Sequence, residues 1–194
     1  MEIILASASV RREELLRRII KKFEIIKSDF DEESVKVKEN LSSYVMEISS
    51  GKAQSVQKTV NGDFIIIGCD TIVCLKDQVL GKPKNKLEAT NMLKALSGNI
   101  HKVLTGITII NTVSNKILTD YVCTEVKFSV LDDEVIEKYV QSGDCLDKAG
   151  AYGIQGYGGI FVEEIHGCYY NVVGLPMNRL VLLLREMGVN ILKE

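Results

Sequence analysis

The sequence has 194 residues, of which 46% are hydrophobic and 26% are charged, and this composition favours one globular domain over 1–194. The 24 Lys and Arg residues nearly balance the 26 Asp and Glu residues, so no global basic field exists to hold nucleic acid or an anionic membrane nonspecifically. No secretory leader follows Met1 and no apolar run approaches the ~20 residues of a membrane-spanning helix, so we expect a cytoplasmic protein without a membrane partner.

Strands and helices alternate in the first part of the chain. Hydrophobic spacing predicts, in chain order, a strand at 2–6, a helix at 10–22, a strand at 23–28, a helix at 40–60 and a strand at 63–75. Ser9 suits the N-cap of the first helix, and Gly51 weakens the second helix locally. The strand at 63–75 is so apolar that we expect it to be central and buried on both faces.

The rest of the chain contains further helices and an extended hairpin. The pattern predicts a helix at 85–98, antiparallel strands at 101–113 and 116–130, a helix at 131–143, a glycine-dense segment at 148–165 that leads into a strand, and a helix at 176–188. Glycines stop three of these helices, at Gly98, Gly143 and Gly188. This mixture predicts an α/β fold with a mixed sheet.

The stretch LASASVRREELL, at 5–16, places hydroxyl and guanidinium groups where a strand meets a helix N-terminus. Such a junction offers free N–H groups and a helix dipole that both favour an anion, and the arginine fork suits phosphate. Ser7, Arg11 and Arg12 are therefore candidate phosphate ligands. The alternative is that both arginines are solvated and pair with Glu13 and Glu14.

Carboxylates and lysines elsewhere add candidates for chemistry. Asp70 lies inside an apolar strand, where a carboxylate is costly unless it binds a cation, a lysine or a reacting water, or is hydrogen-bonded to backbone. Glu32 in the acidic loop SDFDEE could share a divalent ion with Asp70, or simply be solvated. The sequence also suggests as candidates Lys52, Lys82 between a glycine and a proline, Lys148, and Gln155 within GIQGYGG, although each lysine is commonly a surface residue.

The cysteines and histidines suggest neither a metal site nor a catalytic site. The five cysteines contain no CxxC pair, which argues against a zinc site and a disulfide framework and favours reduced thiols. His101 and His166 are the only histidines, and we expect each to be structural or on the surface.

Eight ordered blocks resemble one known family. LASASVRREELL, SDFDEE, SGKA, IIIGCDTIV, LGKP, LSGNIHKVLTG, DKAGAYGIQG and YYNVVGLP occur in the order found in the Maf (septum formation) proteins, which are nucleoside triphosphate pyrophosphatases. The resemblance spans nearly the whole chain. It implies a fold like that of the inosine triphosphate pyrophosphatases, with a long mixed β-sheet flanked by helices and a cleft between two lobes.

The resemblance also implies roles for residues and a metal. Asp70 corresponds to the proton acceptor, and Glu32 to the acidic residue of the family's loop. The expected catalytic residues are Arg12, Glu32, Lys52, Asp70 and Lys82. The expected substrate-binding residues are Ser7, Arg11, Arg12, Thr71, Lys148 and Gln155. Asp70 and Glu32 are the expected ligands of Mg²⁺ or Mn²⁺, and a homodimer is implied.

Departures from the family pattern bear on the substrate. Val10 stands where many members have proline, and Cys69 where alanine is usual. Members that resemble 7-methyl-GTP pyrophosphatases tend to carry Trp, Gln and Glu at the positions of Arg11, Thr71 and Gln155. Gln155 can donate and accept at once, which suits the imide edge of thymine and uracil, so we expect hydrolysis of dTTP and UTP.

Two other functions stay open. A phosphatase would remove the γ-phosphate and release orthophosphate instead of pyrophosphate. A protein of a different class would sense nucleotides and regulate septum formation or cell division without catalysis, and Asp70 would then be dispensable. The sequence favours the enzyme, because it supplies every polar group that hydrolysis requires.

Overall fold

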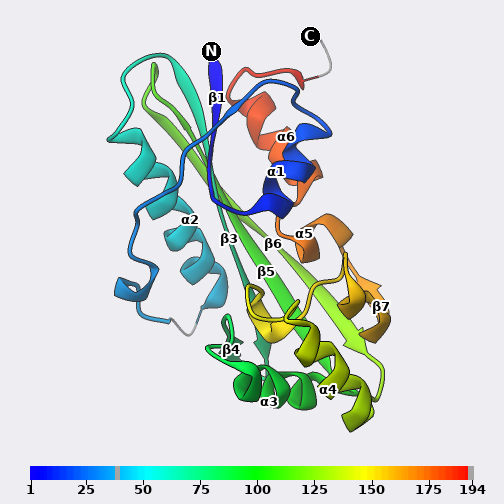
Figure 1. Ribbon diagram of the computed structural model, residues 1–194. Coiled ribbons are helices and arrows are strands. Elements are labelled where there is room, and N and C mark those ends of the chain that lie inside the picture. Colours follow the sequence, from blue (N-terminus) through cyan, green and yellow to red (C-terminus); the bar gives the residue numbers. More distant parts are fainter. Residues whose placement is uncertain (38–39, 192–194) are drawn as a thin grey trace. The chain divides into compact units, whose positions relative to one another are not determined.

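The structure is a computed structural model that describes residues 1–37 and 40–191 (Figure 1). The chain forms two compact units, and each is described by itself below. Unit 1 comprises Met1–Asp70, Thr105–Val122 and Gly174–Glu194, and unit 2 comprises Thr71–Leu104 and Cys123–Val173. The expectations of a single domain and of a cleft stay predictions.

Seven strands of the described residues form one mixed sheet with the order β2-β1-β3-β5-β6-β7, and β4 pairs with β3. The strands are β1 (Glu2–Ala6), β2 (Glu24–Ile25), β3 (Phe64–Leu75), β4 (Gln78–Leu80), β5 (Ile100–Asn111), β6 (Lys116–Phe128) and β7 (Val162–His166). β1 runs parallel to β2 and β3, whereas β4 is antiparallel to β3 and β7 is antiparallel to β6. This arrangement confirms the predicted α/β fold with a mixed sheet.

The helices of the described residues include every predicted helix in the predicted order, together with one short helix that was not predicted. They are α1 (Val10–Arg17), α2 (Leu41–Gln57), α3 (Lys86–Leu96), α4 (Asp133–Ser142), α5 (Tyr169–Val173) and α6 (Met177–Glu186), with 3₁₀ turns η1 (Glu32–Ser34), η2 (Ala149–Ala151) and η3 (Tyr157–Phe161). Within unit 1, Figure 1 shows α2 on one side of the strands and α1 and α6 on the other. In the described part of the chain, every helix is too short or too polar to cross a membrane.

Several elements differ from the sequence prediction. The first helix ends at Arg17 instead of 22, where like charges on a basic stretch would repel one another at i,i+4 spacing. The second strand is reduced to two exposed residues. β4 and α5 were not predicted. β4 follows β3 through a two-residue turn in which Lys76 and Asp77 have positive φ, a conformation usually signalled by Asn or Gly.

Two strand glycines let α2 approach the sheet of unit 1. A Cβ on Gly68 of β3 would lie 2.4 Å from the carbonyl oxygen of Ser49, and a Cβ on Gly106 of β5 would lie 2.3 Å from that of Val45. Hydroxyls strengthen this contact, because the Ser49 and Thr108 oxygens lie 2.9 Å apart. The absence of side chains at these two positions therefore sets the depth of α2.

We expect Gly68→Ala to destabilise the protein by roughly 1–3 kcal/mol, because the new methyl group would meet helix backbone, which yields less readily than a side-chain tip. Urea unfolding measures the change. Gly81→Ala is the matched control, since a Cβ there has nothing within 4 Å, and it should alter stability by less than about 0.5 kcal/mol. Equal stability of the two variants would contradict the close packing.

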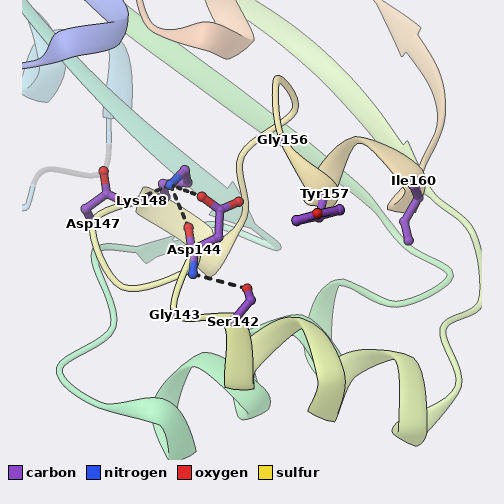
Figure 2. Close-up of a pocket in the computed structure, with 8 residues that line it drawn as sticks. All are labelled: Ser142, Gly143, Asp144, Asp147, Lys148, Gly156, Tyr157 and Ile160. Atoms are coloured by element: carbon purple, nitrogen blue, oxygen red, sulfur yellow. Dashed lines mark hydrogen bonds and ion pairs between the residues drawn. The ribbon is translucent and has the colours of Figure 1, made fainter.

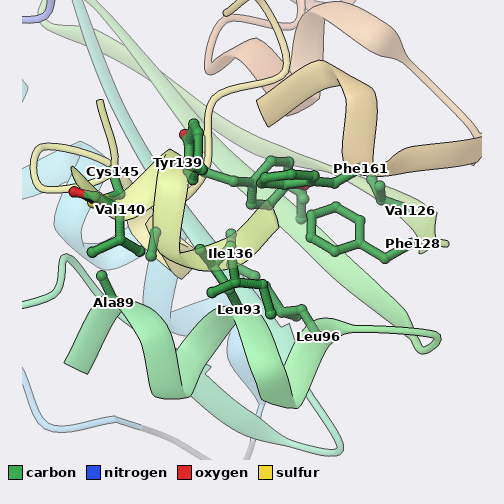
Figure 3. Close-up of a cluster of buried hydrophobic side chains, with 14 residues drawn as sticks. Ala89, Leu93, Leu96, Val126, Phe128, Ile136, Tyr139, Val140, Cys145 and Phe161 are labelled. Carbon is green, nitrogen blue, oxygen red and sulfur yellow. Dashed lines mark hydrogen bonds between the residues drawn. The ribbon is translucent and has the colours of Figure 1, made fainter. Parts of the chain in front are cut away.

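The core of unit 2 is built from α3, α4 and the strands beside them, with aromatic rings at its centre (Figure 3). Phe128 lies edge to face with Tyr152 at 4.7 Å and with Phe161 at 5.8 Å between ring centroids. His101 joins this cluster, and its Nε2 lies 2.8 Å from the Tyr152 hydroxyl. The side chain is 1% exposed, which confirms the expectation that His101 is structural.

Burial lowers the pKa of His101 from 6.5 to about 4. The unfolded chain therefore binds a proton between pH 6.5 and 4 that the folded protein does not, and the free energy of unfolding falls as the pH is lowered through this window. We expect a loss of about 3 kcal/mol from this group. Unfolding titrations from pH 7 to 4 should show a shallower loss for His101→Gln, and an unchanged slope would contradict the assignment.

Candidate active site in unit 1

The Arg12 guanidinium, near the N-terminus of α1, makes two hydrogen bonds that fix its position. The Arg12 Nε donates to the carbonyl oxygen of Gly174 at 2.9 Å, and its Nη1 donates to the buried Ser7 hydroxyl at 3.4 Å. Ser9 caps α1, as predicted, by accepting from the Arg12 backbone N–H at 3.4 Å. These contacts bring Ser7 and Arg12 together at a helix N-terminus, the place predicted for an anion.

Lys52 and Asp70 form a buried ion pair. Lys52 projects from α2 and Asp70 from β3, and Nζ donates to Oδ1 at 2.7 Å. The two residues are 9% and 6% exposed. Of the partners considered for a buried Asp70, the structure supplies a lysine. Removal of either charge would leave the other in a poorly solvated position.

Glu32 approaches the same ammonium from η1. Its Oε1 lies 2.9 Å from the Lys52 Nζ, although its side chain is half-exposed. Gly51 positions this segment, because its missing side chain admits the Phe30 ring, which a Cβ would meet at 2.4 Å. Gly51, predicted only to weaken α2, thus lies in a continuous helix and leaves room for the ring of Phe30, two residues before Glu32.

Cys69, between Gly68 and Asp70, is a buried thiol close enough to Arg12 and Lys52 to be affected by the charge of both. Burial raises the pKa of its thiol to about 11, and the charges of Arg12 and Lys52 oppose that rise. Both cations therefore act on one position of β3. The thiol remains protonated at neutral pH, so Cys69 is a small apolar neighbour of Asp70 and no nucleophile.

Tyr44, which the sequence prediction missed, is influenced electrostatically by this site. Burial raises the pKa of its hydroxyl, and the carboxylates of Asp70 and Glu32 raise it further. Tyr44 precedes Lys52 by eight positions on α2, two intervals of four, which places both on one helix face. The spacing of Tyr44 and Lys52 was the one feature of the sequence that could have suggested Tyr44. It pointed to the carboxylates only once the structure showed that Lys52 pairs with Asp70.

The donor set is compatible with a divalent cation. Asp70 and Glu32 both reach the Lys52 ammonium, so their oxygens converge on one positively charged centre. Among the described residues there is no group of three or more acidic, histidine or cysteine side chains able to hold a metal. Two carboxylates match the way Mg²⁺ is commonly bound, because phosphates and water complete its six ligands.

The remaining predicted residues fall elsewhere. Arg11, partly exposed, is the second residue of α1 in unit 1. In unit 2, Thr71 follows Asp70 on β3, Lys82 lies exposed after β4, and Gln155 lies exposed in the glycine-dense segment. Lys148 borders a pocket of about 810 Å³ lined by residues from 142–148 and 156–160 (Figure 2). Their roles at the substrate stay predictions.

A family match and two similar proteins relate this chain to the same group of proteins. The family described as "Maf-like protein" matches residues 2–187. A protein of Clostridium botulinum (strain Kyoto / Type A2), named dTTP/UTP pyrophosphatase, is 60% identical over 191 residues, covering 97% of this chain and 98% of its own. A protein of Clostridium novyi (strain NT) with the same name is 59% identical, covering 98% of this chain and 100% of its own.

Solved structures with a similar arrangement are more distant in sequence. The structure of a HAM1 protein from Coxiella burnetii aligns with a TM-score of 0.49 at 17% identity, covering 96% of this chain and 99% of its own. A nucleoside-triphosphatase / dITP/XTP pyrophosphatase from Mycobacterium abscessus aligns with a TM-score of 0.48 at 13% identity, covering 96% of each chain.

Proposed function

The chain belongs to the Maf family, and from that premise we propose that it hydrolyses nucleoside triphosphates, with dTTP and UTP preferred, to the monophosphate and pyrophosphate. The observation that carries the proposal is the convergence of Asp70, Lys52 and Glu32 in unit 1. A buried carboxylate paired with a lysine, and a second carboxylate within reach of the same ammonium, provide both a base and charge complementary to phosphate.

The proposed reaction is an in-line displacement at the α-phosphorus. Asp70 accepts a proton from a water molecule whose oxygen forms a bond to that phosphorus. The bond from the α-phosphorus to the bridging oxygen breaks, and pyrophosphate leaves with the electron pair. Lys52 and Arg12 stabilise negative charge on the phosphate oxygens, and Ser7 orients Arg12 through their hydrogen bond.

Asp70 and Glu32 are the residues that would hold Mg²⁺ or Mn²⁺. When bound, the ion would neutralise charge on the phosphate oxygens. We propose that Lys52, whose ammonium contacts both carboxylates, keeps their oxygens oriented toward one point in the free enzyme.

We assign the proposed roles in unit 2 from the family motifs. Lys82 follows Gly81 and precedes the buried Pro83, which restricts the backbone from which its exposed ammonium extends toward phosphate. We likewise assign Arg11 of unit 1, and Thr71 and Gln155 of unit 2, each from its own motif, to recognition of the base. An amide that both donates and accepts matches the carbonyl and imide groups shared by thymine and uracil. Action in the cytoplasm and as a homodimer stay predictions.

The test is kcat/KM for dTTP, UTP, CTP, GTP and 7-methyl-GTP with Mg²⁺ or Mn²⁺, with products identified. We expect pyrophosphate and monophosphate, and a preference for dTTP and UTP of at least about tenfold, because a polar site discriminates against bases that leave its groups unpaired. Orthophosphate with diphosphate would refute the reaction. A purine as the best substrate would refute the base preference and leave the reaction intact.

A further inference from the structure

The segment that carries Gln155 is a tight turn in unit 2. The Gly156 N–H donates to the Gly153 carbonyl at 3.2 Å, and the Gly159 N–H donates to the Gly156 carbonyl at 3.0 Å. The Gln155 side chain is exposed and makes no hydrogen bond to another described residue. The position of the Gln155 amide therefore depends on the backbone of the turn and on the side chains that support this backbone.

Tyr139 of α4 holds the beginning of the turn. Its hydroxyl oxygen accepts from the Gly153 N–H at 3.2 Å and donates to Asp144 Oδ2 at 3.3 Å. Burial, together with the Asp144 carboxylate, raises the pKa of Tyr139, so the hydroxyl retains its proton. Asp144 thus fixes the direction of the hydroxyl, and the hydroxyl in turn receives the amide of Gly153.

Lys148 connects Asp144 to the same turn from another side. Its ammonium donates to Asp144 Oδ1 at 2.9 Å, to the Asp144 carbonyl at 2.6 Å and to Asp147 Oδ1 at 2.7 Å (Figure 2). Its side chain is only 12% exposed. All three ammonium protons are accounted for, so the charge of Lys148 is directed at Asp144 and Asp147.

The turn lies directly against this group. A Cβ on Gly153 would lie 2.5 Å from the Lys148 Cε, and a Cβ on Gly156 would lie 2.9 Å from Asp144 Oδ2. A Cβ on either of these glycines would therefore collide with the Asp144–Lys148 pair unless that pair shifted, so the missing side chains let the turn pack against the pair. Close packing against this pair accounts for the glycines at positions 153 and 156.

We propose that Asp144 is a positioning residue that, through Tyr139 and Lys148, holds the turn at 153–156 and so sets the base selectivity of Gln155. The selectivity part rests on the proposed function. In this arrangement Lys148 acts through the turn, and its predicted contact with the substrate stays a separate prediction. The ion pair lies on the pocket wall formed by 142–148 and 156–160.

Amide hydrogen exchange tests the positioning without reference to activity. Asp144→Ala should accelerate exchange in peptides covering 150–161 by about tenfold, because the turn loses a charged partner of two supporting side chains. Asp147→Ala is the matched control, because Asp147 contacts the same ammonium but its side chain is 67% exposed. In this variant, exchange in peptides covering 150–161 should match that of wild type. Tyr139→Phe removes only the hydroxyl that accepts from the Gly153 N–H, and it should accelerate exchange as Asp144→Ala does. It provides the test if Asp144→Ala does not fold. Unchanged exchange in the folded Asp144 and Tyr139 variants overturns the proposal.

Kinetics then test the selectivity. Asp144→Ala should lower the ratio of kcat/KM for dTTP over GTP by at least about fivefold, in the same direction as Gln155→Ala, and should change that ratio no further in a Gln155→Ala background. An equal loss for both nucleotides overturns the link to selectivity. If the wild-type protein hydrolyses no triphosphate, the proposed function fails, and the exchange data still decide whether Asp144 holds the turn.

Discussion

Asp70→Asn is expected to lower kcat by about 10²–10⁴-fold while the protein remains folded, because the amide can neither accept a proton nor bind a cation strongly. The fold should survive, since the amide oxygen still accepts from Lys52 and the Glu32 carboxylate lies 2.9 Å from the same ammonium. The measurement is pyrophosphate release from dTTP under saturating conditions, with circular dichroism to monitor the fold.

Asp63→Asn provides the matched control for this substitution. Asp63 immediately precedes β3 and is exposed, so the same chemical change there should leave kcat within about twofold of wild type. If Asp70→Asn retains more than about a tenth of the wild-type rate, Asp70 is not the base. An alternative role as a nucleotide sensor would also be favoured if such a variant still perturbed cell division.

Lys52→Met should destabilise the protein by about 3–5 kcal/mol, because it leaves the Asp70 carboxylate buried without its cation. Both side chains of this pair are about nine-tenths buried, so solvent screens their interaction little. Urea unfolding at pH 7 measures the loss. The double variant with Asp70→Asn should recover most of it, since the buried charge is then removed together with its partner.

An exposed pair gives the comparison. Lys138 and Glu134 of α4 are both about three-quarters exposed, and their atoms lie 2.6 Å apart, so distance alone does not distinguish them from Lys52 and Asp70. Lys138→Met should change stability by no more than about 0.5 kcal/mol. A similar small value for Lys52→Met, or a double variant as unstable as the single, would show that the buried pair carries no special cost.

Local signals in the sequence determined much of the fold. Apolar periodicity located the strands β1, β3, β5 and β6 and the helices α1, α2, α3, α4 and α6. Gly143 and Gly188, both with positive φ, follow the ends of α4 and α6 as predicted. Ser9 caps α1 as predicted. These features depend on neighbours within about one helical turn or one strand, so the sequence itself contains their cause.

The sequence also determined that Asp70 needs a partner, because a carboxylate in an apolar strand is unstable alone. Tertiary structure decided which partner, since Lys52 lies 18 residues away on a helix whose depth depends on Gly68 and Gly106. It likewise brought Tyr44 within the electrostatic influence of the two carboxylates and placed the Asp144 carboxylate against Gly156 of the Gln155 turn. Burial, charge pairing and close backbone approach are properties of residues distant in the chain, and no local pattern encodes which of them will meet.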